Sequence, residues 1–142
     1  MVGFRMTRLS VKVMVNGTFD ILHRGHIELL NYAKSLGTQL LVAIDTDRRV
    51  SALKGTNRPI NNQEDRKLFL HNLKAVDTVM MFDSKEELVS IMKEYQPDIY
   101  VKGSDWKHDK ASTAEQHCKK VIYYDRVGDY STTKTIQDII NR

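Results

Sequence analysis

The sequence has little cysteine and no long apolar run, and both absences limit what the protein can be. Cys118 is the only cysteine among 142 residues, so no intrachain disulfide can form, which is typical of a reducing cytosol. No apolar stretch approaches the roughly 20 residues of a membrane-spanning helix. Residues 1–10 contain too few apolar side chains for a signal peptide. We therefore expect a cytoplasmic protein without a membrane partner.

The charges are spread along the chain, without a block of five like charges. Lysine and arginine number 22 against 18 acidic residues, a formal net charge of +4 that suits a small anionic substrate as well as a nucleic acid. The aromatic residues are scattered, and there is neither an RNA-recognition motif nor a basic stripe. We expect no nucleic-acid partner, and one domain at residues 11–142 after an N-terminal extension of residues 1–10.

Apolar runs alternate with amphipathic runs along the chain. They predict strands at residues 11–16, 40–44, 78–82, 98–102 and 121–124, and helices at about 25–36, 62–73, 86–95 and 131–140, with a further helix after Ser112. Gly37 is expected to cap the first helix, and Asn61 with Glu64 to form a capping box. The polar stretch 45–62 lacks clear periodicity and is expected to be a long loop.

Strands that alternate with helices predict a parallel sheet with right-handed crossovers. We expect an α/β protein with a Rossmann-like five-stranded sheet, strand order 3-2-1-4-5, and helices on both faces. Ligands bind beside the point where such an order reverses, at the carboxyl ends of the strands. The Asn16–His26 junction, the Lys102–Trp106 segment and the helix that begins at Ser131 are therefore expected to surround one crevice.

Two histidines, His23 and His26, stand where the first helix begins, behind a turn that contains Gly17. The amides of a first helical turn have no partner inside the helix and the helix dipole is positive there, so this junction favours a polyanion. A metal would need a third ligand, and His117 with Cys118 is the only other pair of soft ligands close in sequence. We expect phosphate rather than metal at the two histidines.

Segment Gly17–His26 resembles the signature of the cytidylyltransferase-like nucleotidyltransferases, whose HxGH element is His23-Arg24-Gly25-His26 here. Three later segments match the family in the same order, namely Arg58–Arg66, Val101–Trp106 and the serine-threonine signature Ser131–Lys134. An isolated HxGH element would be weak support. Four matches between about residues 11 and 140 are strong support.

The resemblance implies that a substrate phosphate attacks the α-phosphorus of a nucleoside triphosphate and that pyrophosphate leaves, without a covalent enzyme intermediate. It implies catalytic roles for His23, His26, Lys54 and Arg66, and nucleotide contacts from Gly17, Thr18, Phe19, Gly25, Lys102, Gly103, Ser131, Thr132 and Thr133. It assigns Asp20, Asp105 and Trp106 to the acceptor substrate. Mg²⁺ is expected mainly on the triphosphate and water, and a homodimer is expected because family members are commonly dimers.

Several of these residues have a second interpretation. Asp20 could tie down its own turn, Lys54 could be a loop lysine, Arg66 could fix the shape of the site or lie on a solvated helix face, and Trp106 could anchor the core. Ser131 is a helix cap under either interpretation, because a cap and a phosphate site use the same amides.

The substrates are left open between two subgroups of the family. Leu53-Lys-Gly, Arg58-Pro-Ile-Asn and Val101–Trp106 resemble the adenylyltransferase part of ADP-heptose synthases, which join ATP to a heptose 1-phosphate. Glu64–Lys67 and Ser131–Lys134 also resemble glycerol-3-phosphate cytidylyltransferase, which makes CDP-glycerol. Lys102 and the Arg58-Pro59 pair favour the first, although Ser104 stands where it has a second glycine. A non-catalytic nucleotide- or RNA-binding module is a distant alternative.

Overall fold

The computed structural model describes residues 9–103, 116–126 and 128–142. Its strands are β1 (Lys12–Gly17), β2 (Gln39–Asp45), β3 (Thr78–Phe82), β4 (Ile99–Gly103) and β5 (Lys120–Tyr124). Its helices are α1 (Arg24–Ser35), α2 (Asp47–Lys54), α3 (Gln63–His71), α4 (Lys85–Tyr95) and α5 (Thr132–Ile140). Among the described residues, no helix is long and apolar enough to cross a membrane.

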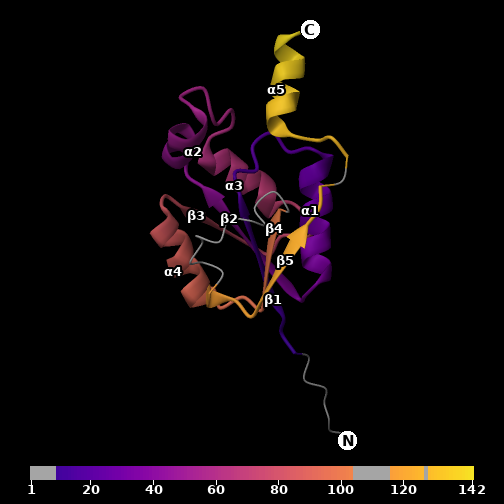
Figure 1. Ribbon diagram of the computed structural model, residues 1–142, viewed down its shortest axis with the longest axis vertical. Coiled ribbons are helices and arrows are strands. Elements are labelled where there is room, and N and C mark those ends of the chain that lie inside the picture. The colour runs from indigo at the N-terminus through magenta and orange to yellow at the C-terminus, as the bar shows by residue number, and fades with distance from the viewer. Residues whose placement is uncertain (1–8, 104–115, 127) are drawn as a thin grey trace, which may run out of the picture.

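All neighbouring strands are parallel, and the sheet order is β3-β2-β1-β4-β5. Figure 1 shows the strands side by side between helices, with α5 standing beyond the carboxyl end of the sheet. The predicted α/β class and strand order are confirmed. The reversal of order falls between β1 and β4, which places a candidate ligand site at the carboxyl ends of these two strands.

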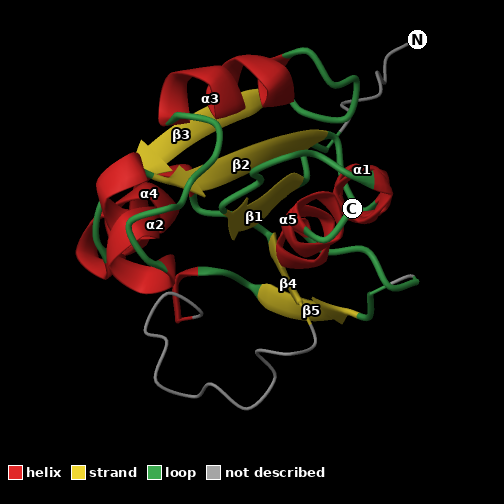
Figure 2. Ribbon diagram, turned by 90° about the horizontal axis from the view of Figure 1, so that it is seen from above, coloured by secondary structure: helices red, strands yellow, loops and turns green. Residues whose placement is uncertain are grey.

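Strand β2 explains why the sheet needs helices on both faces. Its residues from Leu40 to Ile44 are all buried, and successive side chains point to opposite faces. Leu40, Val42 and Ile44 join one apolar cluster with Leu30 and Ala33 of α1 and Leu70 of α3. Leu41 and Ala43 join the other cluster with Leu88, Ile91 and Met92 of α4. Figure 2 shows α1 and α3 on one side of the sheet and α4 on the other.

The expected long loop at residues 45–62 is wrong, because it contains α2. Thr46 caps this helix by accepting a hydrogen bond from the Arg49 N–H, and Asp47 stands in its first turn. Val50 is its only buried residue, so the helix has no periodic apolar face that the sequence could display.

Two expected caps are also corrected. The N-cap of α3 is Asn62 rather than Asn61, and its side chain accepts from the Asp65 N–H. Helix α1 ends at Leu36 in a right-handed conformation, so Gly37 is not a left-handed cap. Gly37 instead allows close packing, since a Cβ atom there would lie 2.5 Å from the Val11 carbonyl oxygen. The helix expected after Ser112 falls largely outside the described residues.

Candidate active site

The turn between β1 and α1 is held in a conformation that its residues disfavour. Phe19 and Ile21 have φ angles of 54° and 48°, in the left-handed region that non-glycine residues rarely adopt. The cost is greatest for a β-branched residue such as Ile21. Phe19 is 5% exposed and packs in the core. Other segments must therefore stabilise this turn.

Asp20 connects the turn to two distant segments. Its carboxylate, in a residue 1% exposed, accepts hydrogen bonds from the N–H groups of Ile60 at 2.6 Å and Asn61 at 2.9 Å. Its main-chain carbonyl accepts a 2.6 Å hydrogen bond from the Thr132 hydroxyl. The carboxylate thus fastens the segment before α3 rather than its own turn, and the carbonyl fastens the start of α5.

Arg66 is fully buried and fastens the same turn from α3. Its guanidinium donates to the carbonyl oxygens of Asn61, Thr18 and Asp45, each at 2.9 Å. It also donates to the Asp47 carboxylate at 2.9 Å. Of the alternatives for Arg66, these contacts favour fixing the shape of the site over a solvated helix face.

His23 and His26 cap α1 reciprocally. His23 Nδ1 accepts a hydrogen bond from the His26 N–H at 3.4 Å, and His26 Nδ1 accepts from the His23 N–H at 3.2 Å. The two rings stack with centroids 3.7 Å apart and an interplanar angle of 21°. A neutral imidazole that accepts at Nδ1 carries its proton on Nε2. The cap therefore leaves an Nε2–H donor on each histidine.

Burial favours the neutral form of both imidazoles. Burial, together with the nearby His23 and Lys54, lowers the pKa of His26 to about 3. Burial also lowers the pKa of His23, and the charge of Arg126 adds to this. A neutral Nε2–H donor needs no counter-ion before the ligand arrives.

A pocket of about 270 Å³ opens beside these histidines, at the carboxyl edge of the sheet. It is lined by His23, Gly25, His26, Leu29, Lys54, Arg58, Gly103, Tyr124, Arg126, Tyr130, Ser131, Thr132 and Thr133. Eight residues assigned from the sequence are in this lining: His23, His26, Lys54, Gly25, Gly103, Ser131, Thr132 and Thr133. Gly17, Thr18, Phe19, Asp20, Arg66 and Lys102 are outside it, and Asp105 and Trp106 lie outside the described residues.

Three cationic side chains from different segments line the pocket. Lys54 stands at the end of α2, and burial and then the charge of Arg58 lower its pKa. Arg58 Nη1 donates to the Thr133 hydroxyl at 3.4 Å, but its buried Nε and Nη2 have no hydrogen-bond partner among the described residues. Arg126 lines the pocket just after β5. Orphaned buried donors are costly, so Arg58 in particular fits an anionic ligand.

The start of α5 forms the remaining wall. Ser131 is its N-cap and accepts from the Lys134 N–H at 2.9 Å. The Thr132 hydroxyl proton is already donated to Asp20, so a phosphate would meet the main-chain amide of Thr132 rather than its side chain. Ser131, Thr132 and Thr133, at the start of α5, line the same pocket as the histidines.

The model of the family described as cytidylyltransferase-like matches residues 14–138, which is most of the sequence and includes the whole site. The chain belongs to the cytidylyltransferase-like family. It is a nucleotidyltransferase of this family, as the resemblance of four separate segments implied.

Relatives within the cytidylyltransferase-like family agree with this assignment. The chain is 44% identical over 127 residues to the bifunctional protein HldE of Campylobacter fetus, covering 89% of the chain and 27% of that protein. It is 45% identical over 127 residues to HldE of Nitratiruptor sp., covering 88% and 27%. It therefore spans about a quarter of the length of these relatives.

A solved structure shares the fold. The lipopolysaccharide core biosynthesis protein from Thermoplasma volcanium superposes with a TM-score of 0.65 at 30% identity, covering 86% of this chain and 99% of that one.

The sequence interpretation missed Arg58 and Arg126 as individual site residues. Arg58 enters the sequence interpretation only through family motifs that begin with it, and Arg126 belongs to none of the motifs. The position of Arg126 in the sequence could have indicated its place in the site. Arg126 follows the end of β5, and the carboxyl ends of parallel strands meet at one edge of the sheet. For Arg58, no local signal exists, because its orientation depends on the contact with Thr133 of α5.

Proposed function

We propose that this protein transfers a nucleotidyl group from a nucleoside triphosphate to a small sugar phosphate, most closely in the manner of an ADP-heptose synthase adenylyltransferase. One observation carries the proposal. Two imidazole N–H donors, three cationic side chains and the N-terminus of α5 converge on a single pocket. A triphosphate is the ligand whose charge matches this set of donors.

The reaction that fits the site is an in-line displacement. An oxygen of the acceptor phosphate attacks the α-phosphorus, the bond from that phosphorus to the bridging oxygen of the β-phosphate breaks, and pyrophosphate departs with the bonding electrons. Both reactants carry negative charge, so the protein acts by holding them together and by stabilising charge as it moves to the leaving group.

The two histidines supply the donors closest to the reacting phosphates in this proposal. Because their Nδ1 atoms are occupied by the cap of α1, only the Nε2–H groups are available for phosphate oxygens. The cap holds both rings before the nucleotide binds, so little reorganisation is needed during the reaction.

Lys54, Arg58 and Arg126 receive the departing pyrophosphate in this proposal, together with the amides of the first turn of α5. The free Nε and Nη2 donors of Arg58 would form their missing hydrogen bonds with its oxygens. Asp20 and Arg66 act indirectly, by holding the strained turn against the Ile60–Asn61 segment and α5.

Magnesium fits this site through the nucleotide rather than through the protein. Among the described residues, no group of three His, Cys, Asp or Glu side chains could hold a metal ion. The buried carboxylates of Asp20 and Asp45 already accept hydrogen bonds from protein groups. Triphosphate oxygens and water would hold Mg²⁺, which supplies positive charge to the phosphates.

The relatives and the sequence motifs support the proposed choice of acceptor. The HldE proteins and the lipopolysaccharide core biosynthesis protein support a heptose 1-phosphate acceptor with ATP as donor. The Glu64–Lys67 and Ser131–Lys134 segments make CTP with glycerol 3-phosphate the second candidate. A homodimer stays a prediction from the family resemblance.

The test incubates the full chain with Mg²⁺ and either ATP or CTP, in a panel of heptose 1-phosphate, other sugar 1-phosphates and glycerol 3-phosphate. Pyrophosphate release and the mass of the nucleotide product are measured. We expect turnover with ATP and heptose 1-phosphate. Silence with every pair would contradict the transferase proposal, and CDP-glycerol formation alone would establish the second candidate.

The variant His26→Asn tests the role of His26 in this reaction. An asparagine oxygen can still accept from the His23 N–H as Nδ1 does, but the Nε2–H donor is lost. Turnover should fall by about 100-fold or more, with the fold retained. Turnover near that of the parent protein would remove His26 from the mechanism.

A further inference from the structure

His23 and His26 belong to a longer column of rings that runs from the core to the surface. Phe19 lies 5.2 Å from His26, His26 lies 3.7 Å from His23, and His23 lies 6.2 Å from Tyr130, all between ring centroids. The Tyr130 ring is nearly parallel to His23, at 19°, which is an offset stack. Phe19 at the inner end is buried, whereas Tyr130 at the outer end is 40% exposed.

Two glycines leave the space that Tyr130 occupies. A Cβ atom on Gly128 would lie 2.9 Å from Tyr130 Cε2, and one on Gly25 would lie 3.1 Å from Tyr130 Cβ. Gly128 also has a φ of +74°, which a side chain would disfavour. The chain therefore turns at Gly128 and brings the ring of Tyr130 against the start of α1.

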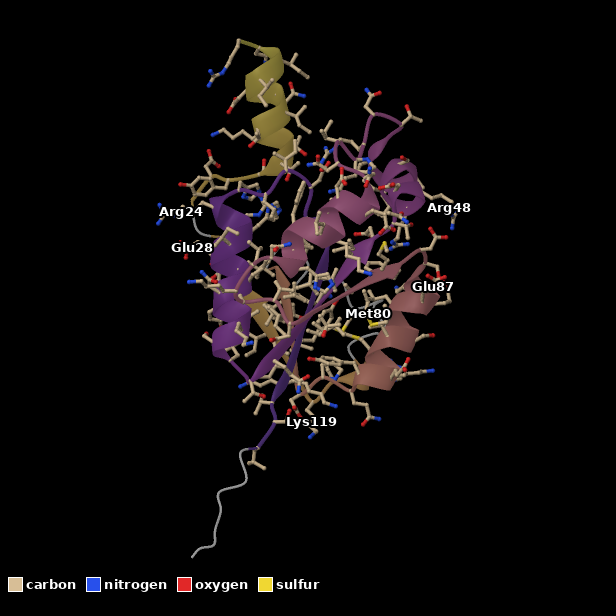
Figure 3. All side chains as sticks on the ribbon, turned by 180° about the vertical axis from the view of Figure 1, so that it is seen from behind. Arg24, Glu28, Arg48, Met80, Glu87 and Lys119 are labelled. Carbon is tan, nitrogen blue, oxygen red and sulfur yellow. The ribbon has the colours of Figure 1, made fainter. Side chains whose placement is uncertain are left out.

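Tyr130 also has a fixed place in the chain and a polar contact at its outer end. It directly precedes Ser131, the N-cap of α5, so its backbone belongs to the second phosphate-facing wall of the pocket. Together with Glu28, the phenol group of Tyr130 lies close enough to the guanidinium of Arg24, in the first turn of α1, to raise the pKa of Arg24. Figure 3 shows Arg24 and Glu28 on the outer side of α1, beside the segment that leads to α5.

We propose that Tyr130 is a positioning residue that sets His23 relative to the N-terminus of α5. The expected effect of Tyr130 on turnover rests on the proposed nucleotidyl transfer. Its effect on the position of His23 does not. The hydrogen bond that orients His23 is long, at 3.4 Å between His26 N and His23 Nδ1. A ring stacked on the open side of His23 prevents the imidazole from swinging out of the column.

The consequence falls on turnover more than on nucleotide binding. In the proposed function, Lys54, Arg58 and Arg126 supply the positive charge for a triphosphate, and all three line the pocket, Lys54 and Arg58 from segments other than that of Tyr130. The alignment of His23 with the reacting phosphates does depend on the Tyr130 ring. A misplacement of about 1 Å in such a group can cost roughly 100-fold in rate.

The experiment compares Tyr130→Ala, Tyr130→Leu and Tyr130→Phe in the full chain. Phenylalanine keeps the stacked ring and loses only the contact with Arg24, leucine keeps apolar volume without a flat ring, and alanine removes both. We expect kcat to fall about 10- to 100-fold in the alanine variant, with KM for the nucleotide changed less than about threefold. The leucine variant should lie between, and phenylalanine should restore kcat to within about threefold of the parent.

A second readout does not require turnover. Long-range ¹H–¹⁵N NMR spectra of the ligand-free protein identify the tautomer of His23. The parent and Tyr130→Phe should show a proton on Nε2, whereas Tyr130→Ala should show exchange between both tautomers. An unchanged tautomer together with an unchanged kcat in the alanine variant would overturn the proposal.

Failure of the proposed function is separable from failure of this inference. If the parent shows no turnover with any substrate pair, the NMR comparison still decides the role of Tyr130. If the His23 tautomer changes in Tyr130→Ala but not in Tyr130→Phe, this result would support the positioning role of Tyr130 even without measurable turnover.

Discussion

The Thr132 hydroxyl donates a 2.6 Å hydrogen bond to the main-chain carbonyl oxygen of Asp20, which lies 112 positions earlier in the sequence. This contact joins the first turn of α5 to the strained turn between β1 and α1, where Phe19 and Ile21 have positive φ angles. Each half of the pocket therefore depends on the other. Removing the contact should loosen the alignment of the two phosphate-facing walls.

Thr132→Val should lower both stability and turnover, because valine keeps the shape of threonine without its donor. The unpaired Asp20 carbonyl should cost about 1–2 kcal/mol in the free energy of unfolding. Misalignment should reduce kcat/KM about tenfold or more. Urea unfolding and pyrophosphate release measure the two effects.

Thr135→Val is the matched control for that change. The Thr135 hydroxyl donates at 3.0 Å to the Ser131 carbonyl within the same helix, so it joins no separate segments. Its loss should leave kcat/KM within about twofold of the parent. Equal losses of turnover in both valine variants would refute a specific role for the Asp20 contact.

Asp20→Asn should be more damaging than loss of the Thr132 hydroxyl. The carboxylate accepts from two N–H groups, and an amide can present an oxygen to only one of them. We expect a loss of about 2–3 kcal/mol in unfolding free energy and a fall in kcat of about 100-fold.

Asp98→Asn tests whether this loss is specific to the site. Asp98 accepts from the Lys12 N–H at 2.8 Å, at the amino end of the sheet, and pairs with Lys119. Its change should lower stability but leave kcat unchanged. A comparable fall in kcat would show that general destabilisation explains the result for Asp20.

Arg58→Met should weaken nucleotide binding without weakening the fold. The buried Nε and Nη2 donors have no partner among the described residues, so the substitution costs only the exposed 3.4 Å hydrogen bond from Nη1 to the Thr133 hydroxyl, which water can replace. We expect KM for the nucleotide to rise at least about tenfold, with the unfolding free energy within about 0.5 kcal/mol of the parent or higher. Isothermal titration with a non-hydrolysable triphosphate measures the affinity.

Arg48→Met provides the comparison for Arg58. Arg48 is an exposed residue of α2 that pairs with Asp83, on the outer side of the helix (Figure 3). An exposed ion pair contributes little to stability, and the Arg48 side chain does not line the pocket. Nucleotide affinity should be unchanged in this variant, and equal weakening in both would argue against a direct role for Arg58.

Stability should decrease as the pH falls from about 6.5 toward 3, in part through His26. Burial lowers the pKa of His26 to about 3, so between these values the unfolded chain binds a proton that the folded protein excludes. The His26 contribution is fully present above the unfolded pKa and is lost through this window. Urea unfolding at about pH 7.5, 6 and 5 measures the trend.

His26→Asn isolates that contribution, because asparagine does not titrate. As the pH falls, the unfolding free energy of the parent should decrease relative to that of the variant. Carboxylates such as Asp98, whose pKa is lowered mainly by the Lys12 N–H, titrate in both proteins and cancel in the difference. A difference independent of pH would contradict the lowered pKa of the partly buried His26 imidazole.

The sequence by itself determined the sheet and the place of the site. Continuous apolar runs such as Leu40–Ile44 predict strands covered on both faces, and their alternation with helices predicts a parallel sheet. In such a sheet, every strand end that precedes a helix meets the same edge. The histidines and the Ser131 cap could therefore be assigned to one crevice before any contact was known.

The tertiary structure alone decided which side chains line the pocket and which hold its walls in place. Arg58 lines the pocket, whereas the guanidinium of Arg66 donates its hydrogen bonds to main-chain carbonyl oxygens. The Asp20 carboxylate binds the N–H groups of residues 60 and 61 rather than groups of its own turn. Helix α2 was missed because only Val50 is buried. The physical reason is separation along the sequence. Apolar periodicity is a local property of the chain, whereas these hydrogen bonds join groups 40 to 112 positions apart. Only the packing of the folded chain brings such groups together.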